Sequence, residues 1–288
     1  MSSRPTIAII PYRAYPNFGL SKMNLNDLHW PLGRPSRLNS GTISKMKKTD
    51  HLITYPRKSV FLFPRFYVKA QISVVICEPD IIHKKYLKWS QFLNWRFYKI
   101  LTKSKSLLSK IDNGILFIAG GTFINNFNNL NNKKTKLLSI IASQKKDLEG
   151  HKLRHKIINY IQKNKLAGDI IGRGYKPFKN KEEGLSPYHY SVVIENIQET
   201  NYFSEKLIDC FLCETIPIYW GAKNILDHFD ERGMIICTSE KEIQNELKKI
   251  STEIYNSKLE WIKKNRILAL NYVNFNDRVA KLINDSLK

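Results

Sequence analysis

Hydrophobic residues in the second half of the chain form short runs that alternate with amphipathic stretches. Apolar runs typical of buried strands occur at 137–143, 168–174, 190–196, 215–221 and 234–239. Helical spacing of apolar positions occurs between them, at 152–164, 204–214 and 240–266. Strands that alternate with helices in this way predict βαβ units on a parallel sheet.

The first half of the chain shows a less regular pattern. Strand-like runs occur at 6–10, 59–63, 71–77 and 115–120. Aromatic residues and leucines recur at helical spacing over 83–100. Residues 12–58 are rich in Pro, Gly, Ser and basic residues and show little periodicity, so we expect long loops with short elements there.

An Asn- and Lys-rich stretch separates the two halves. Residues 123–136 read FINNFNNLNNKKTK, a low-complexity composition that suits a linker. A chain of 288 residues is long enough for two domains of moderate size. We therefore predict an N-terminal domain over 1–135, a C-terminal domain over 136–265 and a C-terminal helical segment over 266–288.

The net charge of +22 is concentrated in the first half of the chain. Residues 1–135 hold 22 Lys and Arg but only 5 Asp and Glu, a net charge of +17. The electrostatic field of such a charge attracts anionic partners, which include nucleic acid, anionic lipid and acidic glycan. The charge by itself does not indicate which of these partners binds. The basic residues are scattered and match no standard nucleic-acid motif, so a nucleic-acid-binding protein is the alternative rather than the expectation.

No cluster of residues in the sequence predicts a metal site. Cys210 and Cys213 form one CxxC without a second Cys or His pair, and they fit buried helix packing better than zinc binding. His151 and His155 are four residues apart, but Lys152 stands where the HExxH motif has its catalytic Glu.

The sequence also allows a prediction of where in the cell the protein is located. No run approaches 18 consecutive apolar residues, and the apolar stretch before Pro11 is too short for the core of a signal peptide. We expect a cytoplasmic protein whose basic half makes peripheral contact with an anionic membrane surface.

The charged stretch IENIQETNYFSEK at 194–206 joins a predicted strand to a predicted helix. Ligands of parallel sheets bind beyond the carboxyl ends of the strands, where this stretch lies. Ser204 is a plausible N-cap, and the free N–H groups of a helix N-terminus can hold an anion. Lys206 in the first turn opposes the helix dipole unless an anion is present. By themselves, Glu205 and Lys206 fit either a nucleotide site or a solvated pair.

The wider block LSPYHYSVVIENIQETNYFSEKLIDCFLCETIPIYWGAKNI resembles the donor-binding domain of the α-1,3/1,4-fucosyltransferases, glycosyltransferase family 10. An aromatic-rich strand ends in Glu195-Asn196. The residues Tyr202-Phe203-Ser204-Glu205-Lys206 match the family pattern Tyr-x-Thr-Glu-Lys, and Pro217-Ile218-Tyr219-Trp220-Gly221 matches Pro-Val-x-x-Gly. The upstream order LLSIIASQK, GHKLRHKI and GDIIGRGY is also similar.

The resemblance covers residues 136–240 well and 71–125 weakly. Two positions depart from the family pattern. Ile197 replaces the usual Ser after Glu-Asn, which bears on donor identity, and Ser204 replaces Thr but keeps a capping hydroxyl.

The resemblance implies an α/β fold of GT-B type, with two Rossmann-like domains facing a central cleft. It also implies an inverting glycosyltransferase that moves L-fucose from GDP-fucose to a hydroxyl of a glycan acceptor, with no metal cofactor required. The same fold acting on another nucleotide-sugar donor is the alternative.

The family's donor-site roles can be carried over to matching positions in this chain. Lys206 would hold the diphosphate with Arg154 as its partner. Glu205 would bind the ribose hydroxyls, and Asn196 and Tyr202 would line the nucleotide and fucose pocket. The competing interpretation of Arg154 is a solvent-facing charge on an amphipathic helix.

The catalytic base of the family is a Glu in the N-terminal domain. Glu78 is the only Glu in residues 1–135 and follows a predicted strand, so it is our candidate for the base. Asp80 is the second candidate.

Overall fold

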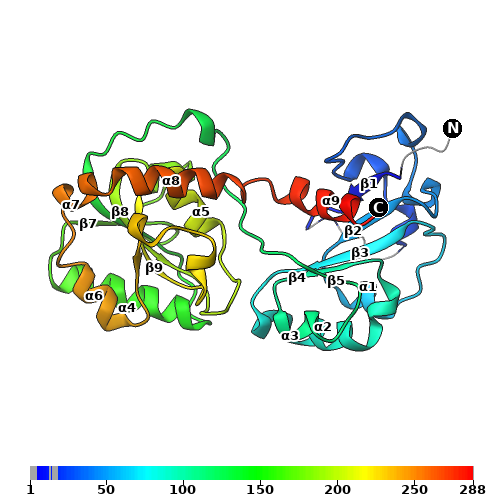
Figure 1. Ribbon diagram of the computed structural model, residues 1–288, viewed down its shortest axis with the longest axis horizontal. Helices are drawn as coiled ribbons and strands as arrows, with labels where there is room; N and C mark the ends of the chain where they lie inside the picture. The colour runs from blue at the N-terminus through cyan, green and yellow to red at the C-terminus, as the bar shows by residue number, and fades with distance from the viewer. Residues whose placement is uncertain (1–4, 13, 15–18, 288) are drawn as a thin grey trace. The chain divides into compact units, whose positions relative to one another are not determined.

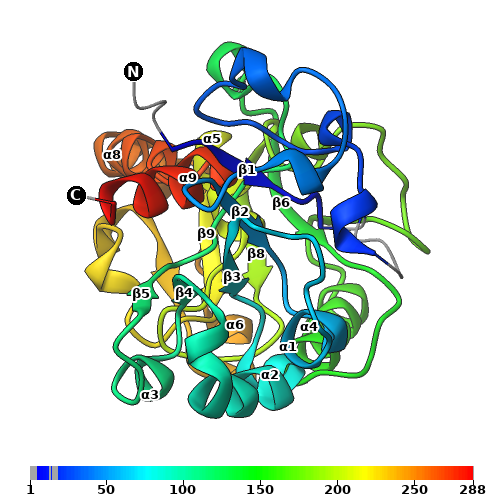
Figure 2. The same ribbon diagram turned by 90° about the vertical axis from the view of Figure 1, so that its right-hand side faces the viewer.

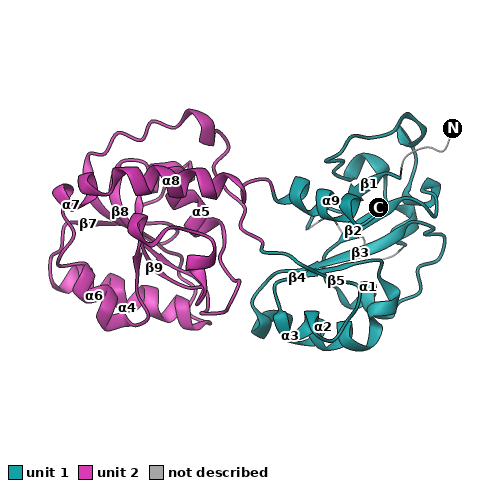
Figure 3. Cartoon of the chain, viewed as in Figure 1, with its two compact units in different colours: residues 1–118, 275–288 teal, residues 119–274 magenta. Residues whose placement is uncertain are grey.

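The computed structural model describes residues 5–12, 14 and 19–287 and divides into two compact units. Unit 1 comprises residues 1–118 and 275–288, and unit 2 comprises residues 119–274 (Figure 3). Each described unit contains a five-stranded parallel sheet with helices packed on it. The α/β class predicted from the alternating pattern is therefore confirmed.

The structural boundaries differ from those drawn from composition, which placed the first boundary after residue 135. The Asn- and Lys-rich stretch packs on unit 2 instead of linking the units. The Lys134 amino group donates hydrogen bonds to the carbonyl oxygens of Ser186 and Cys213 and to Thr215 Oγ1. A half-buried lysine with three acceptors fixes this segment. Burial of the amino group lowers the pKa of Lys134 to about 8, with Cys213, Cys210 and Glu214 opposing that effect.

The predicted C-terminal segment 266–288 is also divided between the units. Helix α8 (Leu259–Leu270) belongs to unit 2, whereas α9 (Phe275–Asp285) returns to unit 1. There α9 buries Val279, Ala280 and Ile283 in the apolar core. Low complexity in the sequence does not show where the chain crosses between units, because that depends on which core each helix covers.

The sheet of unit 1 has the strand order β1-β2-β3-β4-β5, with all neighbours parallel. Its strands are β1 (Ile7–Ile9), β2 (His51–Thr54), β3 (Gln71–Ile76), β4 (Ile100–Thr102) and β5 (Gly114–Leu116). Besides α9, its helices are α1 (Lys58–Leu62), α2 (Asp80–Leu93) and α3 (Lys105–Leu108). Strand β3 is central, so residues that follow it lie at the middle of the sheet's carboxyl edge.

The secondary structure of unit 1 differs most from what the hydrophobic pattern predicts. The run at 59–63 forms most of helix α1 and its C-cap and is not a strand. Neighbouring Val60 and Phe61 are both buried and Leu62 and Phe63 both exposed, whereas side chains of a strand with one buried face alternate. Strands β2 and β4 were missed, since runs of three or four residues carry too little periodicity to recognise.

The sheet of unit 2 has the order β10-β9-β8-β6-β7, again with all neighbours parallel. Its strands are β6 (Lys136–Ile141), β7 (Gly168–Ile171), β8 (Tyr188–Ile194), β9 (Ile216–Trp220) and β10 (Ile235–Ile236). The five strand runs predicted from the sequence are confirmed here. The strand order reverses at β6, between β7 on one side and β8 on the other, and such a switch point opens a ligand crevice at the carboxyl ends of the strands.

Helices cover both faces of the unit 2 sheet. Figure 1 shows α4 (Glu149–Lys163) and α6 (Glu240–Glu246) on one face, with α5 (Glu205–Leu212) and α8 on the other. Helix α7 (Thr252–Ser257) precedes α8. Every residue of β8 is buried, as expected for a central parallel strand covered on both faces. In the part of the chain that the structure describes, no helix has the length and apolar character to cross a bilayer.

Candidate functional site

A pocket of about 480 Å³ opens at the switch point of the unit 2 sheet. Its walls come from the segments that follow β6 and β7 and from the end of β8, with side chains added by α4 and α5. The side chains that line it include Phe123, Arg154, Arg173, Phe178, Lys181 and Lys206. The pocket therefore lies where the strand order predicts a ligand crevice.

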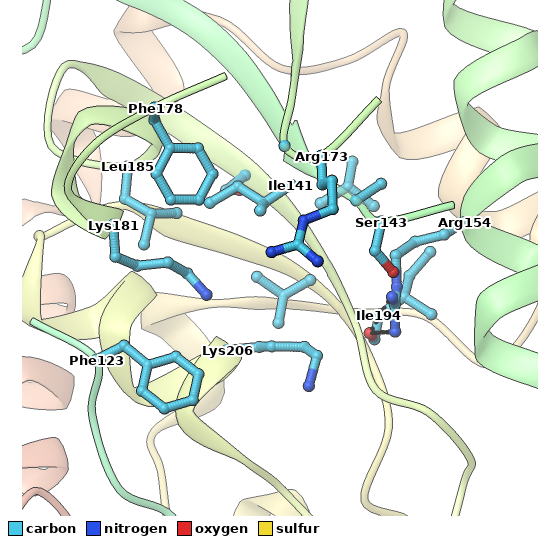
Figure 4. A pocket seen from close by; sticks show the side chains of 15 residues that line it. Phe123, Ile141, Ser143, Arg154, Arg173, Phe178, Lys181, Leu185, Ile194 and Lys206 are labelled. Atoms are coloured by element: carbon cyan, nitrogen blue, oxygen red, sulfur yellow. Dashed lines mark hydrogen bonds between the residues drawn. The ribbon is translucent and has the colours of Figure 1, made fainter. Parts of the chain in front are cut away.

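Four cationic side chains converge on this pocket. Figure 4 shows the Arg173 guanidinium and the amino groups of Lys181 and Lys206 directed into the same space, with Arg154 at its edge. None of the described lining residues is acidic, and Phe123 and Phe178 supply an aromatic wall. Cations around a partly apolar pocket favour a ligand with a strong negative charge and a flat or apolar part.

The buried carboxylate of Glu195 organises the N-terminus of α5. Its side chain is fully buried. It accepts a hydrogen bond from the Ser204 backbone N–H at 2.8 Å and another from the Ser204 hydroxyl at 2.7 Å. The Lys206 amino group lies 3.5 Å from the same carboxylate. A buried carboxylate is stable only with such partners, so Glu195 fixes the end of β8 to the start of α5.

Ser204 is the N-cap of α5, as predicted from the sequence. Its hydroxyl donates to Glu195 and accepts from the Lys206 backbone N–H at 3.4 Å. It also accepts from the Lys206 amino group at 2.9 Å. One hydroxyl thus uses its proton and both lone pairs, which only Ser or Thr can do at this position.

Lys206 lies between two carboxylates, Glu195 and Glu205, whose oxygens are 3.5 and 3.4 Å from its amino group. Burial by itself lowers the pKa of Lys206, but the two carboxylates outweigh burial and raise it. Burial likewise favours a higher pKa for Glu205, but Lys206 and then Lys181 outweigh burial and lower it. A lysine at a helix N-terminus is repelled by the positive end of the helix dipole, and the charges of Glu195 and Glu205 offset this repulsion. Lys206 therefore stays protonated.

Arg154 on α4 is buried, with 6% of its surface exposed. Its Nε and Nη2 donate to the Ile194 carbonyl oxygen at 3.2 and 2.9 Å, and Nη2 also donates to Asn196 Oδ1 at 3.1 Å. The interpretation of Arg154 as a solvent-facing charge is therefore wrong. Burial lowers its pKa, and Glu195 opposes that shift.

Close packing between α4 and the end of β8 brings Arg154 to this position. Gly150 donates its backbone N–H to the Asn196 carbonyl oxygen at 3.0 Å. A Cβ at residue 150 would lie 1.7 Å from the Glu195 carbonyl oxygen, so only glycine allows this approach.

The predicted donor-site residues lie near one another in the structure, but only some of them line the pocket. Arg154 and Lys206 line the pocket, while Asn196 and Glu205 contact these two cations. Tyr202 is 5% exposed and does not appear among the lining residues.

The two candidate bases lie in unit 1. Glu78 follows β3 and is half-buried. Asp80 begins α2 and pairs with the buried amino group of Lys103 at 2.6 Å, so its carboxylate neutralises a buried cation.

Arg173 and Lys181 line the pocket but are not among the site residues predicted from the sequence. Arg173 lies between Gly172 and Gly174, whose φ angles of +125° and +93° turn the chain sharply after β7. A charged residue between two glycines at a strand end was a usable signal. Lys181 begins a short 3-10 helix (Lys181–Gly184) between β7 and β8, and its sequence context carried no such signal.

Asp209 on α5 anchors one side of the pocket. Its fully buried carboxylate accepts hydrogen bonds from Thr122 Oγ1 at 2.5 Å and the Phe123 backbone N–H at 3.1 Å, and it lies 3.8 Å from the Lys181 amino group. Burial raises the pKa of Asp209 to about 6, while Lys181 opposes the rise. Asp209 therefore holds both Phe123 and Lys181 at the pocket edge.

In the described part of the chain, no group of three or more His, Cys, Asp or Glu side chains gathers as metal ligands do. His151 Nδ1 accepts from the Leu148 backbone N–H at 3.3 Å. The ring nitrogens of His155 lie 3.1 Å from Tyr175 Oη and from the Lys145 carbonyl oxygen.

Comparison with known proteins gives the family. Residues 131–282 match the model described as glycosyltransferase family 10 (fucosyltransferase), C-terminal part. The chain belongs to this family. The matched range covers more than half of the chain, including the whole pocket region except Phe123.

A curated relative, an α-(1,3)-fucosyltransferase of Helicobacter pylori, is 40% identical over 57 residues. This match spans 20% of the chain and 12% of the relative's length. The family assignment thus concerns mainly unit 2, and the sequence similarity covers only a small part of that relative.

Solved structures agree on the fold. A crystal structure of an α1,3-fucosyltransferase matches with a TM-score of 0.51 at 15% identity, covering 76% of each chain. The Anabaena protein HepE, solved with UDP and glucose, matches with a TM-score of 0.60 at 10% identity, covering 85% of this chain and 78% of that one. Both support the GT-B type predicted for this chain, built from two parallel α/β units.

We expect Ser204→Ala to destabilise unit 2 by about 1–3 kcal/mol, because it removes a donor to buried Glu195 and the acceptor of two Lys206 groups. Ser204→Thr keeps the hydroxyl and is the matched control, which should unfold at nearly the wild-type urea concentration. Equal stability of the Ala and Thr variants would contradict the role assigned to this hydroxyl.

We also expect the stability of the protein to report the titration of Asp209. Its pKa is 3.8 when unfolded and about 6 when folded. The folded state therefore binds this proton more tightly. The stabilisation from this group is full below pH 3.8 and is lost as the pH rises through about 6.

The free energy of unfolding of the wild type, measured against Asp209→Asn, should thus increase by about 2 kcal/mol from pH 7 to pH 4. The exposed Glu260→Gln serves as control and should show no such pH-dependent difference. A pH-independent difference for Asp209→Asn would show that Asp209 titrates normally.

Proposed function

We propose that the protein is an inverting glycosyltransferase that transfers L-fucose from GDP-fucose to a hydroxyl of a glycan acceptor. The observation that carries this proposal is the convergence of four cations on the switch-point pocket of a family 10 chain. A nucleoside diphosphate sugar combines a strongly anionic diphosphate with a flat base, which suits this pocket.

In this proposal unit 2 binds the donor. Lys206 binds the diphosphate, and Arg154 acts with it as a second cation. Arg154 uses Nε and Nη2 on Ile194 and Asn196, so among its nitrogens Nη1 is available for a phosphate oxygen. Glu205 accepts hydrogen bonds from the ribose hydroxyls, while Asn196 keeps Arg154 in place. Tyr202 supports the nucleotide side of the pocket from the core.

The chemistry requires both charge stabilisation and a base. As the bond between fucose and GDP breaks, negative charge grows on the leaving diphosphate, and preorganised cations stabilise that charge in the transition state. The raised pKa of Lys206 keeps it protonated for this task. Attack of the acceptor hydroxyl on the opposite face inverts the anomeric carbon, and the hydroxyl proton goes to a carboxylate. These steps use no metal ion.

We assign the base to Glu78 and acceptor binding to unit 1. Glu78 follows the central strand of a parallel sheet, at the edge where ligands of such sheets bind. Asp80 is the weaker candidate, because protonating it would break its ion pair with the buried Lys103 amino group. The cytoplasmic location expected from the sequence belongs to the same proposal.

A different nucleotide-sugar donor is the second candidate, and Ile197 favours it. This half-buried residue stands next to Asn196, where the family pattern has Ser. Transfer assays with GDP-fucose, GDP-mannose and UDP-sugars over a panel of glycan acceptors test both candidates. Activity with GDP-mannose but not GDP-fucose would overturn the fucosyl assignment. Steeply salt-dependent RNA or DNA binding without nucleotide-sugar binding would favour the nucleic-acid alternative.

We expect Lys206→Ala to weaken GDP binding about tenfold to a hundredfold and nearly to abolish transfer, since a charged hydrogen bond contributes about 1.5–3 kcal/mol. Calorimetric titration with GDP measures the first effect and donor turnover the second. Lys152→Ala, an exposed lysine on α4, is the matched control and should leave both unchanged. Unchanged GDP affinity of Lys206→Ala would remove this lysine from the donor site.

We expect Glu78→Gln to bind GDP like the wild type but to lose transfer by about a hundredfold or more, because the base is gone while the donor site is intact. Single-turnover assays with saturating GDP-fucose measure this. Asp112→Asn, an exposed acid of unit 1, is the control. Full activity of Glu78→Gln would show that the base lies elsewhere.

A further inference from the structure

The outward face of α2 in unit 1 carries large apolar side chains and lysines. Ile81, Lys85, Lys88 and Phe92 recur every three or four positions on α2, and Trp95 follows in the short 3-10 helix Asn94–Arg96. These five residues are here called the α2 face. Ile81, Phe92 and Trp95 are 60%, 68% and 72% exposed. These side chains are far more exposed than apolar residues of a packed helix.

The opposite face of α2 already fulfils the helix's structural role. Tyr86, Leu87, Trp89 and Leu93 pack against the core of unit 1, and the Phe61 ring of α1 contacts both Tyr86 and Trp89. Figures 1 and 2 show α1 and α2 side by side. Folding therefore needs no apolar residue on the α2 face, where an ordinary surface helix is polar.

The loop at 63–67 extends this surface. Phe63, Phe66 and Tyr67 are 48%, 72% and 80% exposed. The guanidinium of Arg96 donates to the Phe63 carbonyl oxygen at 2.7 Å, and Arg65 donates in return to the Arg96 carbonyl oxygen. These reciprocal bonds hold the backbone of the loop beside the end of α2. The loop and the α2 face are together called the patch.

Backbone strain occurs within the same patch. Tyr67 has a φ of +61°, a conformation that is unfavourable for a bulky side chain. An exposed aromatic residue in a strained conformation gains nothing from packing in the unit. A gain from an external contact explains its presence better.

The charge around the patch is strongly positive. Residues 57–99 contain nine Lys and Arg and only two acids, Glu78 and Asp80. Both acids precede the α2 face, and Asp80 is paired with Lys103. This surface is therefore complementary to a partner that is anionic and that also accepts apolar side chains.

We propose that the α2 face and the 63–67 loop form a docking surface for an anionic lipid bilayer. Interfacial helices lie in the plane of the membrane with aromatic and aliphatic side chains in the headgroup region and lysines on anionic phosphates. The α2 face is roughly 20 Å long, a suitable length for this orientation.

Two further exposed residues favour lipid over nucleic acid or glycan. Ile82 and Leu62 are aliphatic and are 46% and 44% exposed beside the aromatic residues. Stacking on bases or sugar rings uses flat aromatic faces, whereas exposed aliphatic side chains gain free energy by burial against apolar material, which the hydrocarbon of a bilayer supplies. This surface is separate from the donor pocket, so the proposal does not depend on the transferase activity.

Vesicle co-sedimentation of the full chain tests the proposal, with phosphatidylcholine vesicles that contain or lack phosphatidylserine. We expect binding to the anionic vesicles that weakens as salt rises. Phe92→Ala/Trp95→Ala should reduce binding by more than about tenfold through lost apolar insertion. Lys85→Ala/Lys88→Ala should reduce it about thirtyfold at low salt and flatten the salt dependence.

The matched controls are Leu226→Ala/Ile267→Ala for exposed apolar residues and Lys152→Ala/Lys163→Ala for exposed lysines, all in unit 2. Both should bind like the wild type. Circular dichroism checks that each variant is folded. Trp95→Phe should keep binding but reduce the blue shift of tryptophan fluorescence on vesicles.

Three results would overturn the proposal. They are no binding to anionic vesicles at physiological salt, equal binding of the α2 variants and the wild type, or binding of single-stranded RNA that the α2 variants lose while vesicles are not bound. Loss of GDP binding in the Lys206 variant with vesicle binding intact would separate the two functions.

Discussion

The buried carboxylate of Glu195 is the constraint on which the unit 2 site depends. A charge removed from water requires partners, and Glu195 finds them in the hydroxyl and the backbone N–H of the N-cap residue Ser204 and in the Lys206 amino group. Its backbone N–H meanwhile continues the β8–β9 ladder by bonding to the Trp220 carbonyl oxygen. One residue therefore fixes strand, helix and cation together, and the direction of Lys206 follows from that network.

Cations that share a pocket repel one another, and the structure places acids behind them. Glu195 and Glu205 flank Lys206, while Asp209 lies near Lys181. These acids keep the positive charge directed inward in the absence of a ligand, without lining the pocket themselves. Such an arrangement leaves the inner surface complementary to an anion and keeps the cost of assembling the cations low.

The sequence predicted unit 2 better than unit 1, for physical reasons. The strands of unit 2 are mostly longer, and β8 is covered on both faces, so its apolar run is continuous. Apart from β3, the strands of unit 1 have three or four residues, and its long loops are held by tertiary bonds. One example is buried Asp50, which accepts from Arg37 and from the Lys47 backbone N–H. Such bonds join residues far apart or in irregular turns, and no local period records them.

The sequence by itself determined the alternation of strands and helices in unit 2, the N-cap at Ser204 and the family motif around Glu195 and Lys206. Each of these depends on neighbours within a few residues, which a linear pattern contains. Only the tertiary structure decided that Arg154 is buried against the end of β8 and that Arg173 and Lys181 join the pocket. It also decided that the chain leaves unit 1 after Ile118 and returns with α9. These features follow from which surfaces pack together, because burial and convergence arise from contacts between segments distant in the chain.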